Sequence, residues 1–368
     1  ITNYLKGLFN RFDNRYFSMD SYPFDKNQGF KEKLIPMKRF LPLILCAFLI
    51  SCGLSAQQYL QFEGKDGPGK GKHIVLVAGD DEYRSEESMP MLAKILSEHH
   101  GFKTTVLFPI HPETGDIVPN YQNNIPGLEQ LATADLMIML IRFRELPDEQ
   151  AQYIEGFLKA GKPIIGLRTS THAFAYQKNK DSRFSKWHWM SKVEGWERGF
   201  GQRIFGETWV NHHGNHGKEG TRGLIDGVKQ ANDHPVLRGV TDIWGPSDVY
   251  GIKHLPDDAE ILVYGQSTAE LDPNSSLVWE KSLMPIAWTK PYQIENGKPG
   301  MAFASTMGAS LDFQSEDLRR LILNASFWLL GMEDDIKPDL SVVLVGKYEP
   351  TMFGFDTFRK GMRVSDFK

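Results

Sequence analysis

The chain has 368 residues, of which 24% are charged, and its formal net charge is −4 with histidine neutral. Without a basic excess, it does not have the charge balance of a protein that binds nucleic acid. Its two cysteines, Cys46 and Cys52, both lie in or at the end of an apolar N-terminal stretch. The rest of the chain therefore has no disulfide, no thiolate metal site and no cysteine nucleophile.

Residues 37–56 have the pattern of an export leader. Met37 is followed by two basic residues and by an apolar run of 11 residues, 40–50. A run of this length is short for a membrane span and typical of the core of a signal peptide. Residues 1–36 have neither helical nor strand periodicity, so we expect them to be an upstream extension that is not part of the fold.

The leader has two alternative ends. The stretch LISC, which ends at Cys52, resembles a bacterial lipobox and would leave that cysteine lipidated. The stretch LSA, which ends at Ala56, resembles an ordinary signal-peptidase site. Either end predicts export, to the periplasm or to the cell envelope, and a lipid on Cys52 is the one membrane attachment that we expect.

A polar, glycine-rich stretch at 57–70 is predicted to be a linker, and from Gly71 short apolar runs alternate with amphipathic ones. The run at 134–141 is continuously apolar, as expected of a parallel strand covered on both faces. The alternation predicts an α/β fold with a doubly wound, mostly parallel sheet. The expected strands are 73–79, 102–109, 134–141 and 162–167, and the expected helices are 89–101 and 146–161.

Residues 175–250 are rich in Gly, Trp, His and Asn and have little periodicity, which predicts a long irregular insertion. Such a stretch inside a compact domain is usually functional. The sheet pattern then resumes at 259–267, 283–292 and 300–308, followed by a helix at 315–333. We expect the tail, 335–368, to pack on the domain. No further long apolar run occurs, so no transmembrane span is predicted.

Polar side chains follow the carboxyl ends of four predicted strands, 73–79, 134–141, 162–167 and 300–304. Ligands bind outside the carboxyl ends of the strands in open α/β sheets. If these strands are parallel and adjacent, their polar residues gather at one rim, and a ligand pocket explains the set better than independent loop charges do. The set is Asp80, Asp81, Glu82, Tyr83, Arg84, Arg142, Arg144, Arg168, Thr169, Ser170, Thr171, His172, Ser305, Thr306, Ser310 and Asp312.

Three histidines, His212, His213 and His216, lie within five positions of the segment ETWVNHHGNHG. The glycines around them argue against a helix, so the spacing does not match helical metal ligands. A loop could still present these histidines, with a carboxylate such as Glu207 or Asp80, to zinc, iron or manganese. The sequence thus leaves a metal site as one of three interpretations of the segment.

The second interpretation is a site without metal. Trp209 and Asn211 suit a hydrogen-bonding rim for a sugar, and a histidine that titrates near neutrality suits proton transfer to or from a sugar oxygen. In the third interpretation, part of the segment is structural, with one histidine buried and donating to a backbone carbonyl.

Six stretches of the sequence carry a resemblance to a known family: LVAGDDEYRSEESMPMLAKIL, RFRELPDEQ, PIIGLRTSTHAF, FGETWVNHHGNHG, DHPVLRGVTDIWGPSDVYG and STMGAS. On these stretches, residues 71–334 resemble the trehalose-utilisation, or ThuA-like, domain, a family with the flavodoxin-like fold of class I glutamine amidotransferases. The resemblance implies a link to disaccharide use, with a disaccharide or a keto-sugar as the ligand.

A glutaminase of this fold would place its cysteine on a tight turn after a strand, in a pattern like G-x-C-x-G. Counting from Gly166, this position is Arg168, and no cysteine lies beyond the leader. We therefore expect no hydrolysis of an amide through a thioester. Thr169 and Ser170 lack the G-x-S-x-G context of a serine nucleophile, although His172 is close in sequence.

The leading hypothesis is an exported ThuA-like protein that acts on or binds a small-molecule carbohydrate at the carboxyl rim. A non-catalytic carbohydrate-binding protein and a metal-dependent hydrolase of another substrate are the alternatives, and hydrolase, lyase and isomerase chemistry all stay open, as does the oligomeric state. The predicted catalytic residues are His172, His213, His216, Arg168 and Asp81. The predicted ligand-binding residues are Asp80, Glu82, Arg84, Arg142, Arg144, Thr169, Ser170, Trp209 and Asn211, and the predicted metal ligands are His212, His213 and His216.

Overall fold

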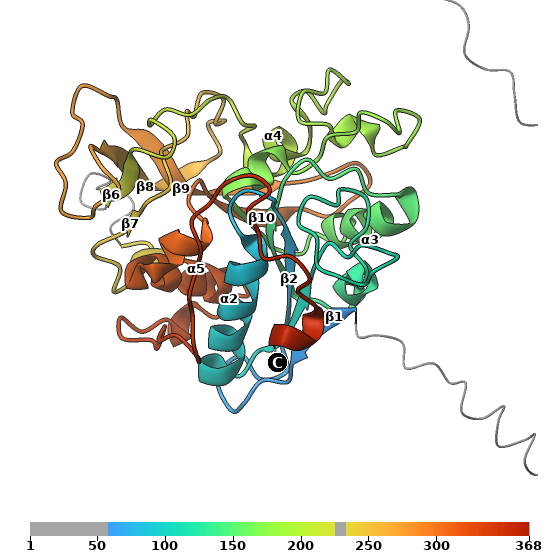
Figure 1. The fold of residues 1–368 in the computed structure, drawn as a ribbon, viewed down its shortest axis with the longest axis horizontal. Coiled ribbons are helices and arrows are strands. Elements are labelled where there is room, and N and C mark those ends of the chain that lie inside the picture. The colour runs from blue at the N-terminus through green and yellow to red at the C-terminus, as the bar shows by residue number, and fades with distance from the viewer. Residues whose placement is uncertain (1–57, 225–232, 368) are drawn as a thin grey trace, which may run out of the picture. The chain divides into compact units, whose positions relative to one another are not determined.

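The computed structural model describes residues 58–224 and 233–367 (Figure 1). The predicted upstream extension, the leader and Cys52 lie outside the described residues. Among the residues that are described, no helix combines the length and the hydropathy that crossing a membrane requires.

A mixed sheet forms the centre of the fold, and its strand order is β1-β3-β2-β4-β5-β10-β9-β8-β6-β7. The neighbours from β3 to β10 in this order are parallel, and the other neighbours are antiparallel. The described strands are β1 (Tyr59–Phe62), β2 (His73–Gly79), β3 (Lys103–Leu107), β4 (Leu136–Ile141), β5 (Ile164–Leu167), β6 (Gly220–Leu224), β7 (Trp244–Gly245), β8 (Glu260–Thr268), β9 (Met284–Tyr292) and β10 (Gly300–Ser305).

The α/β prediction is confirmed, but the sheet is mixed where a mostly parallel one was predicted. Parallel neighbours need a long crossover, usually a helix, whereas antiparallel neighbours need only a loop. No helix is found between β8 and β9 or between β9 and β10 in this fully described stretch. This half of the sheet is therefore antiparallel.

Four α-helices are found in the described chain, with short 3-10 helices between them. The helix α2 ends at Gly101, whose φ of 79° suits a glycine after a helix, and α5 begins after Ser315, whose side chain accepts from Leu318 N–H. The α-helices are α2 (Ser85–His100), α3 (Asp148–Lys159), α4 (Gly199–Phe205) and α5 (Glu316–Leu329). The 3-10 helices are η2 (Leu128–Ala132), η3 (Arg168–His172), η4 (Ser185–Trp187), η5 (Pro235–Leu237), η6 (Ser310–Gln314), η7 (Glu333–Asp335) and η8 (Val364–Phe367).

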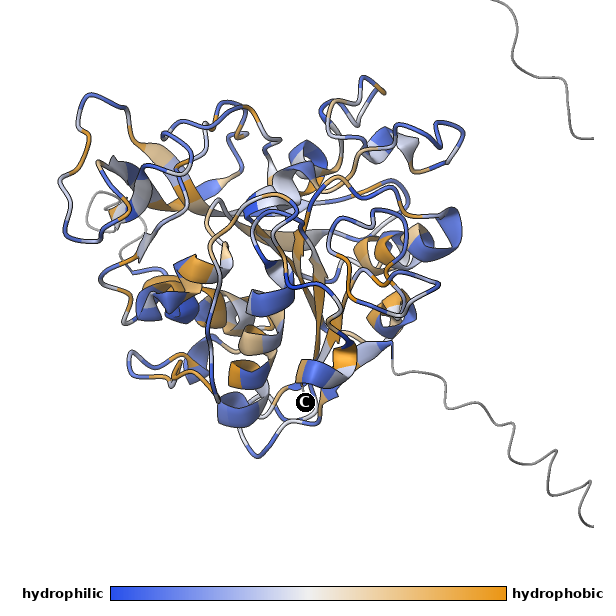
Figure 2. Cartoon of the chain, in the orientation of Figure 1, coloured by the Kyte–Doolittle hydropathy of each residue, from blue (hydrophilic) through white to orange (hydrophobic). Residues whose placement is uncertain are grey.

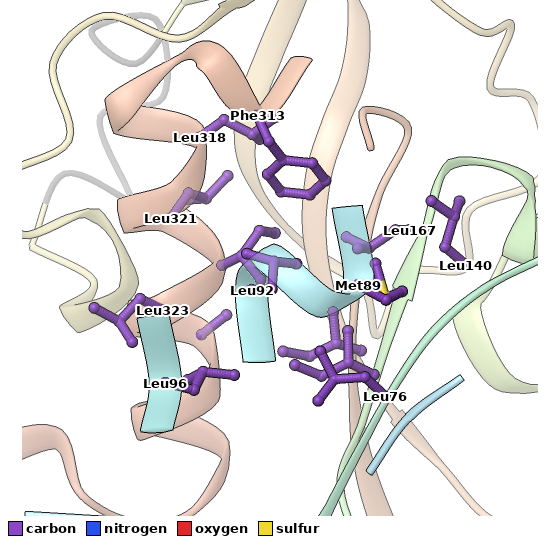
Figure 3. Close-up of a cluster of buried hydrophobic side chains, with 14 of the residues drawn as sticks. Leu76, Met89, Leu92, Leu96, Leu140, Leu167, Phe313, Leu318, Leu321 and Leu323 are labelled. Atoms are coloured by element: carbon purple, nitrogen blue, oxygen red, sulfur yellow. The ribbon is translucent and has the colours of Figure 1, made fainter. Parts of the chain in front are cut away.

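Each face of the sheet has its own core. Successive side chains of a strand point to opposite faces, so Leu76 of β2 packs with α2 and α5, whereas Val75 and Val77 pack with α3 and α4. Figure 3 shows part of the first core, with Leu76 of β2, Leu92 of α2 and Leu321 of α5 among its side chains. In Figure 2 the central strands are mostly orange and the outer loops mostly blue, as this burial requires.

The stretch predicted to be a linker, 57–70, is part of the fold from residue 59. The strand β1 pairs antiparallel with β3, and Gly69 N–H donates to the His100 carbonyl at 2.8 Å. The glycines of this stretch gave it the composition of a linker, but Gly67 and Gly69 instead allow a close approach to His100 and Phe102.

The tail after α5 runs along α2 and α5 and then reaches the edge of the sheet (Figure 1). The side chains of Arg319 and Arg320 donate to the carbonyls of Val342 and Leu340, at 2.8 and 2.6 Å. At the far end, the ring of Phe367 stacks on Phe108 with centroids 5.4 Å apart. The tail thus packs against the domain along its length.

Candidate functional site

Arg168 lies directly after β5 and is the centre of a buried polar network. Its φ is 39°, which is uncommon for any residue other than glycine, and its side chain is fully buried. The guanidinium carbon lies 4.1 Å from the centroid of the Tyr83 ring and 4.2 Å from that of Tyr250. Its Nη2 donates to Asp248 Oδ1 at 2.9 Å and Nη1 donates to the Thr306 carbonyl at 2.8 Å. Arg168 therefore fixes the position of Asp248.

Asp248 in turn holds two histidines. Its Oδ2 lies 2.7 Å from His212 Nδ1 and its Oδ1 lies 3.0 Å from His216 Nδ1. The Asp248 side chain is fully buried, whereas those of His212 and His216 are 34% and 35% exposed. Although burial opposes it, hydrogen bonds with the two histidines and the charge of Arg168 hold the pKa of Asp248 well below its usual value.

His216 lies between two carboxylates. Its Nε2 is 3.2 Å from Glu82 Oε1, and Glu82 Oε2 is 3.3 Å from Arg142 Nη1. Hydrogen bonds with Asp248 and Glu82 raise the pKa of His216 to about 9, so the imidazole carries a proton on each nitrogen at neutral pH. We call His212, His216, Asp248 and Glu82 the histidine cluster.

Aromatic rings lie beside the two imidazoles of the histidine cluster. The centroid of Phe353 lies 5.4 Å from that of His216, and the centroids of Trp209 and Tyr250 lie 5.7 and 5.6 Å from that of His212. Polar groups that converge among aromatic side chains are the usual lining of a site for a small organic ligand. The surroundings of the cluster therefore suit a ligand with both hydroxyl groups and apolar faces.

His172 is buried one ring away from the cluster. Its centroid is 5.1 Å from that of Phe143 and 5.9 Å from that of Trp209. Burial, together with the charges of Arg142 and Arg168, holds the pKa of His172 well below its usual value, so the ring is neutral at physiological pH. Its ring packs against Phe143 and Trp209 rather than against Asp248.

His213, predicted to be catalytic and a metal ligand, is not brought to the cluster. Its Nε2 lies 2.8 Å from the Ser282 carbonyl, and its backbone N–H donates to the Val249 carbonyl at 2.8 Å. His212 forms an antiparallel bridge with Tyr250. The two neighbouring side chains therefore have different partners, Asp248 for His212 and the Ser282 carbonyl for His213.

Several predicted ligand-binding residues use their side chains to fix the backbone around the site. Asp80 Oδ1 accepts from the N–H groups of Glu82 and Tyr83 at 2.7 and 2.6 Å, and Ser170 Oγ donates to the Met139 carbonyl at 2.8 Å. The others of this kind are Arg84 on the Asp81 and Glu82 carbonyls, Arg144 on the Arg142 and Tyr121 carbonyls, and Asn211 on the His212 carbonyl. The Thr169 hydroxyl instead donates to the carboxylate of Asp80. These residues position the loops that carry the cluster.

Glu207, the carboxylate predicted beside the histidines, faces elsewhere. Its side chain accepts from the backbone N–H groups of Lys253 and His254 at 2.6 and 2.7 Å and contacts His254 Nδ1 at 2.8 Å. Asp248 and Glu82 supply the carboxylates of the cluster instead.

The histidine cluster contains a donor set that could hold a metal ion. One ligand atom from each of His212, His216 and Asp248 lies within 4.8 Å of the others. Two imidazoles and a carboxylate suit zinc, iron or manganese. The set differs from the predicted one because Asp248 takes the place of His213.

Three residues at the site were not predicted from the sequence: Asp248, Tyr250 and Phe353. Asp248 and Tyr250 belong to the stretch GPSDVYG, where an acidic residue stands among turn-forming residues inside a long aperiodic region. That context is a signal for a functional loop. Phe353 lies in the tail and has no comparable signal.

No family model matches the chain, and neither does any curated protein. Among solved structures, the chain is similar to a protein described as ThuA-like from Parabacteroides merdae, with 15% identity and a TM-score of 0.47, over 78% of this chain and 98% of that one. It is also similar to a protein so described from Bacteroides uniformis, with 14% identity and a TM-score of 0.42, over 75% of this chain and 98% of that one.

Proposed function

We propose that the chain binds a carbohydrate at the histidine cluster and transfers a proton to or from one of its oxygen atoms. The observation that carries this proposal is the pair of partly exposed imidazoles on one buried carboxylate, Asp248. The resemblance of the sequence to the ThuA-like family points to a disaccharide or a keto-sugar as the ligand.

His212 is the residue that we assign to proton transfer. Asp248 accepts from its Nδ1–H, which leaves the lone pair of Nε2 free, and Nε2 has no hydrogen-bond partner among the residues that the structure describes. A carboxylate that fixes the tautomer of a histidine in this way prepares it as a general base. His216 differs because both of its nitrogens are bonded to carboxylates, so it balances the charge of Asp248 and Glu82.

We also propose that the chain has no glutaminase activity. The position after β5 where a glutaminase would keep its nucleophile is filled by Arg168. A buried guanidinium paired with a carboxylate is no nucleophile, and thioester chemistry requires a thiolate.

Replacing His212 with alanine is expected to reduce turnover of a sugar substrate by about 10²- to 10⁴-fold, the usual contribution of a general base. Binding should fall much less, because the aromatic rings beside the cluster, Trp209, Tyr250 and Phe353, stay in place. Turnover would be followed by mass spectrometry of products from a panel of disaccharides and keto-sugars, and binding by calorimetry.

The matched control is His213→Ala, which removes a partly exposed histidine next in sequence but outside the cluster. It should keep full turnover. Equal losses of turnover in His212→Ala and His213→Ala would contradict the assignment of proton transfer to His212. Binding without product in the wild-type chain would identify a non-catalytic carbohydrate-binding protein instead.

A second candidate function is metal-dependent hydrolysis, and the three close donor atoms of His212, His216 and Asp248 are the observation that favours it. A bound ion of this kind would supply an activated water. If this function is correct, elemental analysis of the purified protein should find about one zinc, iron or manganese per chain. The metal should be lost in His216→Ala and kept in His213→Ala, and a metal-free wild-type protein with full activity would exclude this function.

A further inference from the structure

A hollow of about 990 Å³ lies at the antiparallel end of the sheet, where β7 is the last strand (Figure 1). Two segments of the chain supply most of its lining: 239–246, which contains β7, and 311–320, which contains the start of α5. Sites for small molecules usually have volumes of about 300–1,000 Å³. No residue of the histidine cluster lines this hollow, so it is a separate candidate site.

Two carboxylates join the two walls of the hollow. Asp317 Oδ2 accepts from the N–H groups of Thr241 and Asp242 at 2.8 and 2.6 Å. Asp312, which is fully buried, accepts from the N–H and the hydroxyl of Ser247 at 3.0 and 2.6 Å. Hydrogen bonds between its own walls thus build the hollow into the fold, and small-molecule sites are usually pre-formed in this way.

The hollow has an apolar lining with a few polar groups. Its apolar residues come from β7, η6, the tail and the loop after β8, and they are Trp244, Pro246, Leu271, Pro273, Leu311 and Met352. This mixture is the usual lining of a site for a small organic molecule. The lining therefore suits a ligand with an apolar body.

The charged residues of the lining indicate which polar group such a ligand carries. They are Asp242, Glu316, Asp317 and Arg320. The side chains of Asp242 and Glu316 are 69% and 64% exposed, whereas that of Arg320 is 8% exposed. Arg320 also donates to the Leu340 carbonyl at 2.6 Å and lies 2.7 Å from Glu316 Oε1. The positive charge is thus buried and paired, and the accessible charge is negative.

The two exposed carboxylates still have room for a cation. Arg222 pairs with Asp242 Oδ1 from outside the lining, and Arg320 pairs with Glu316 Oε1. In the described part of the chain, no hydrogen bond reaches Asp242 Oδ2 or Glu316 Oε2. Exposed carboxylates alone would not indicate a ligand, but these two line an apolar hollow that also contains Trp244.

We propose that this hollow binds an organic cation, in which an ammonium group is carried on an apolar body. The inference is independent of the proposed function, because the hollow shares no residue with the histidine cluster. The ammonium group would lie at Asp242 and Glu316, and the apolar body would pack against Leu311 and Met352. An indole ring attracts a cation as well as an apolar group, so Trp244 fits both parts of such a ligand.

Three indole derivatives that differ in one polar group test the proposal by calorimetry on the full chain. Tryptamine is a cation at neutral pH, tryptophol is uncharged and indole-3-acetate is an anion. We expect tryptamine to bind about tenfold more tightly than tryptophol, and indole-3-acetate not to bind. Raising the salt concentration from about 0.05 to about 0.5 M should weaken the binding of tryptamine and affect that of tryptophol little, because salt screens exposed charges.

Two substitutions test whether tryptamine binds in this hollow. Glu316→Gln removes one exposed carboxylate and is expected to weaken tryptamine binding by about three- to fivefold, with tryptophol unaffected. Met352→Ala removes an apolar contact and is expected to weaken the binding of both compounds by about threefold. Because Glu316 and Met352 are largely exposed, the melting temperature of both variants should stay close to that of the wild type.

Glu349→Gln is the matched control. Glu349 is also an exposed glutamate paired with a cation, Lys347 Nζ at 2.8 Å, but it does not line this hollow. The variant should bind tryptamine as the wild type does. The proposal would be overturned if the wild-type chain bound no tryptamine, or bound indole-3-acetate as tightly as tryptamine. It would also be overturned if Glu316→Gln and Met352→Ala both bound tryptamine with unchanged affinity.

Discussion

Replacing Arg168 with methionine is expected to lower the free energy of unfolding by about 3–5 kcal/mol, the usual effect of removing one partner from a buried ion pair. The variant keeps most of the side-chain volume but leaves the carboxylate of Asp248 without its buried cation. It also leaves the Thr306 carbonyl and the Tyr83 hydroxyl without the N–H groups that they accept from. Urea unfolding at neutral pH, followed by tryptophan fluorescence, measures the change.

Arg183→Met is the control for this prediction. Arg183 Nη1 lies 2.7 Å from Glu155 Oε2, but the arginine side chain is 50% exposed. Exposed pairs of this kind contribute about 0–1 kcal/mol because water screens them. If both variants lost the same small amount of stability, Arg168 would not be the centre of the buried network.

The parallel half of the fold was predictable because its strands are continuous apolar runs. The predicted strand 73–79 is β2, His73–Gly79, and the predicted helix 146–161 contains α3, Asp148–Lys159. By contrast, β6 has the sequence GTRGL, whose two glycines and one charged residue leave no alternation of apolar and polar side chains. It is a strand because it pairs with β7 and β8, which are distant in sequence. Periodicity along the sequence carries no information about pairing between segments that are distant in the chain.

Part of the candidate site was predictable for a simple geometric reason. The strands β2, β4 and β5 are adjacent and parallel, so the residues that follow them meet at one rim, as Glu82, Arg142 and Arg168 do. The remaining parts come from segments without periodicity. Asp248 is 80 positions from Arg168 in the sequence, and only the folded chain brings them together.

The choice between neighbouring histidines also depends on the fold. His212 and His213 are chemically identical and adjacent, and no pattern in the sequence favours one over the other. The bridge between His212 and Tyr250 sets which side chain turns toward Asp248. A high density of histidines can therefore indicate a candidate functional loop. It does not show which of the side chains of that loop face the site.

Glu86→Gln is expected to stabilise the chain at neutral pH by about 3 kcal/mol. Glu86 lies in the first turn of α2 and is 5% exposed, and neither of its carboxylate oxygens has a hydrogen-bond partner in the described part of the chain. Burial raises the pKa of Glu86 from 4.5 to about 8. Between these two values the unfolded chain releases the proton and the folded chain keeps it, so stability falls as the pH rises, by about 1.4 kcal/mol per pH unit.

Glutamine has nearly the same shape as a protonated glutamate and does not ionise. The loss of stability with rising pH should therefore be absent in Glu86→Gln. The two proteins should have equal stability in urea near pH 4.5, and their difference should grow until about pH 8 and then stay constant. Glu129→Gln, at an exposed position of η2, should show no such growth. A difference between Glu86→Gln and the wild type that is the same at every pH would mean that Glu86 is ionised in the folded chain. A partner for its charge would then have to lie within reach of the first turn of α2.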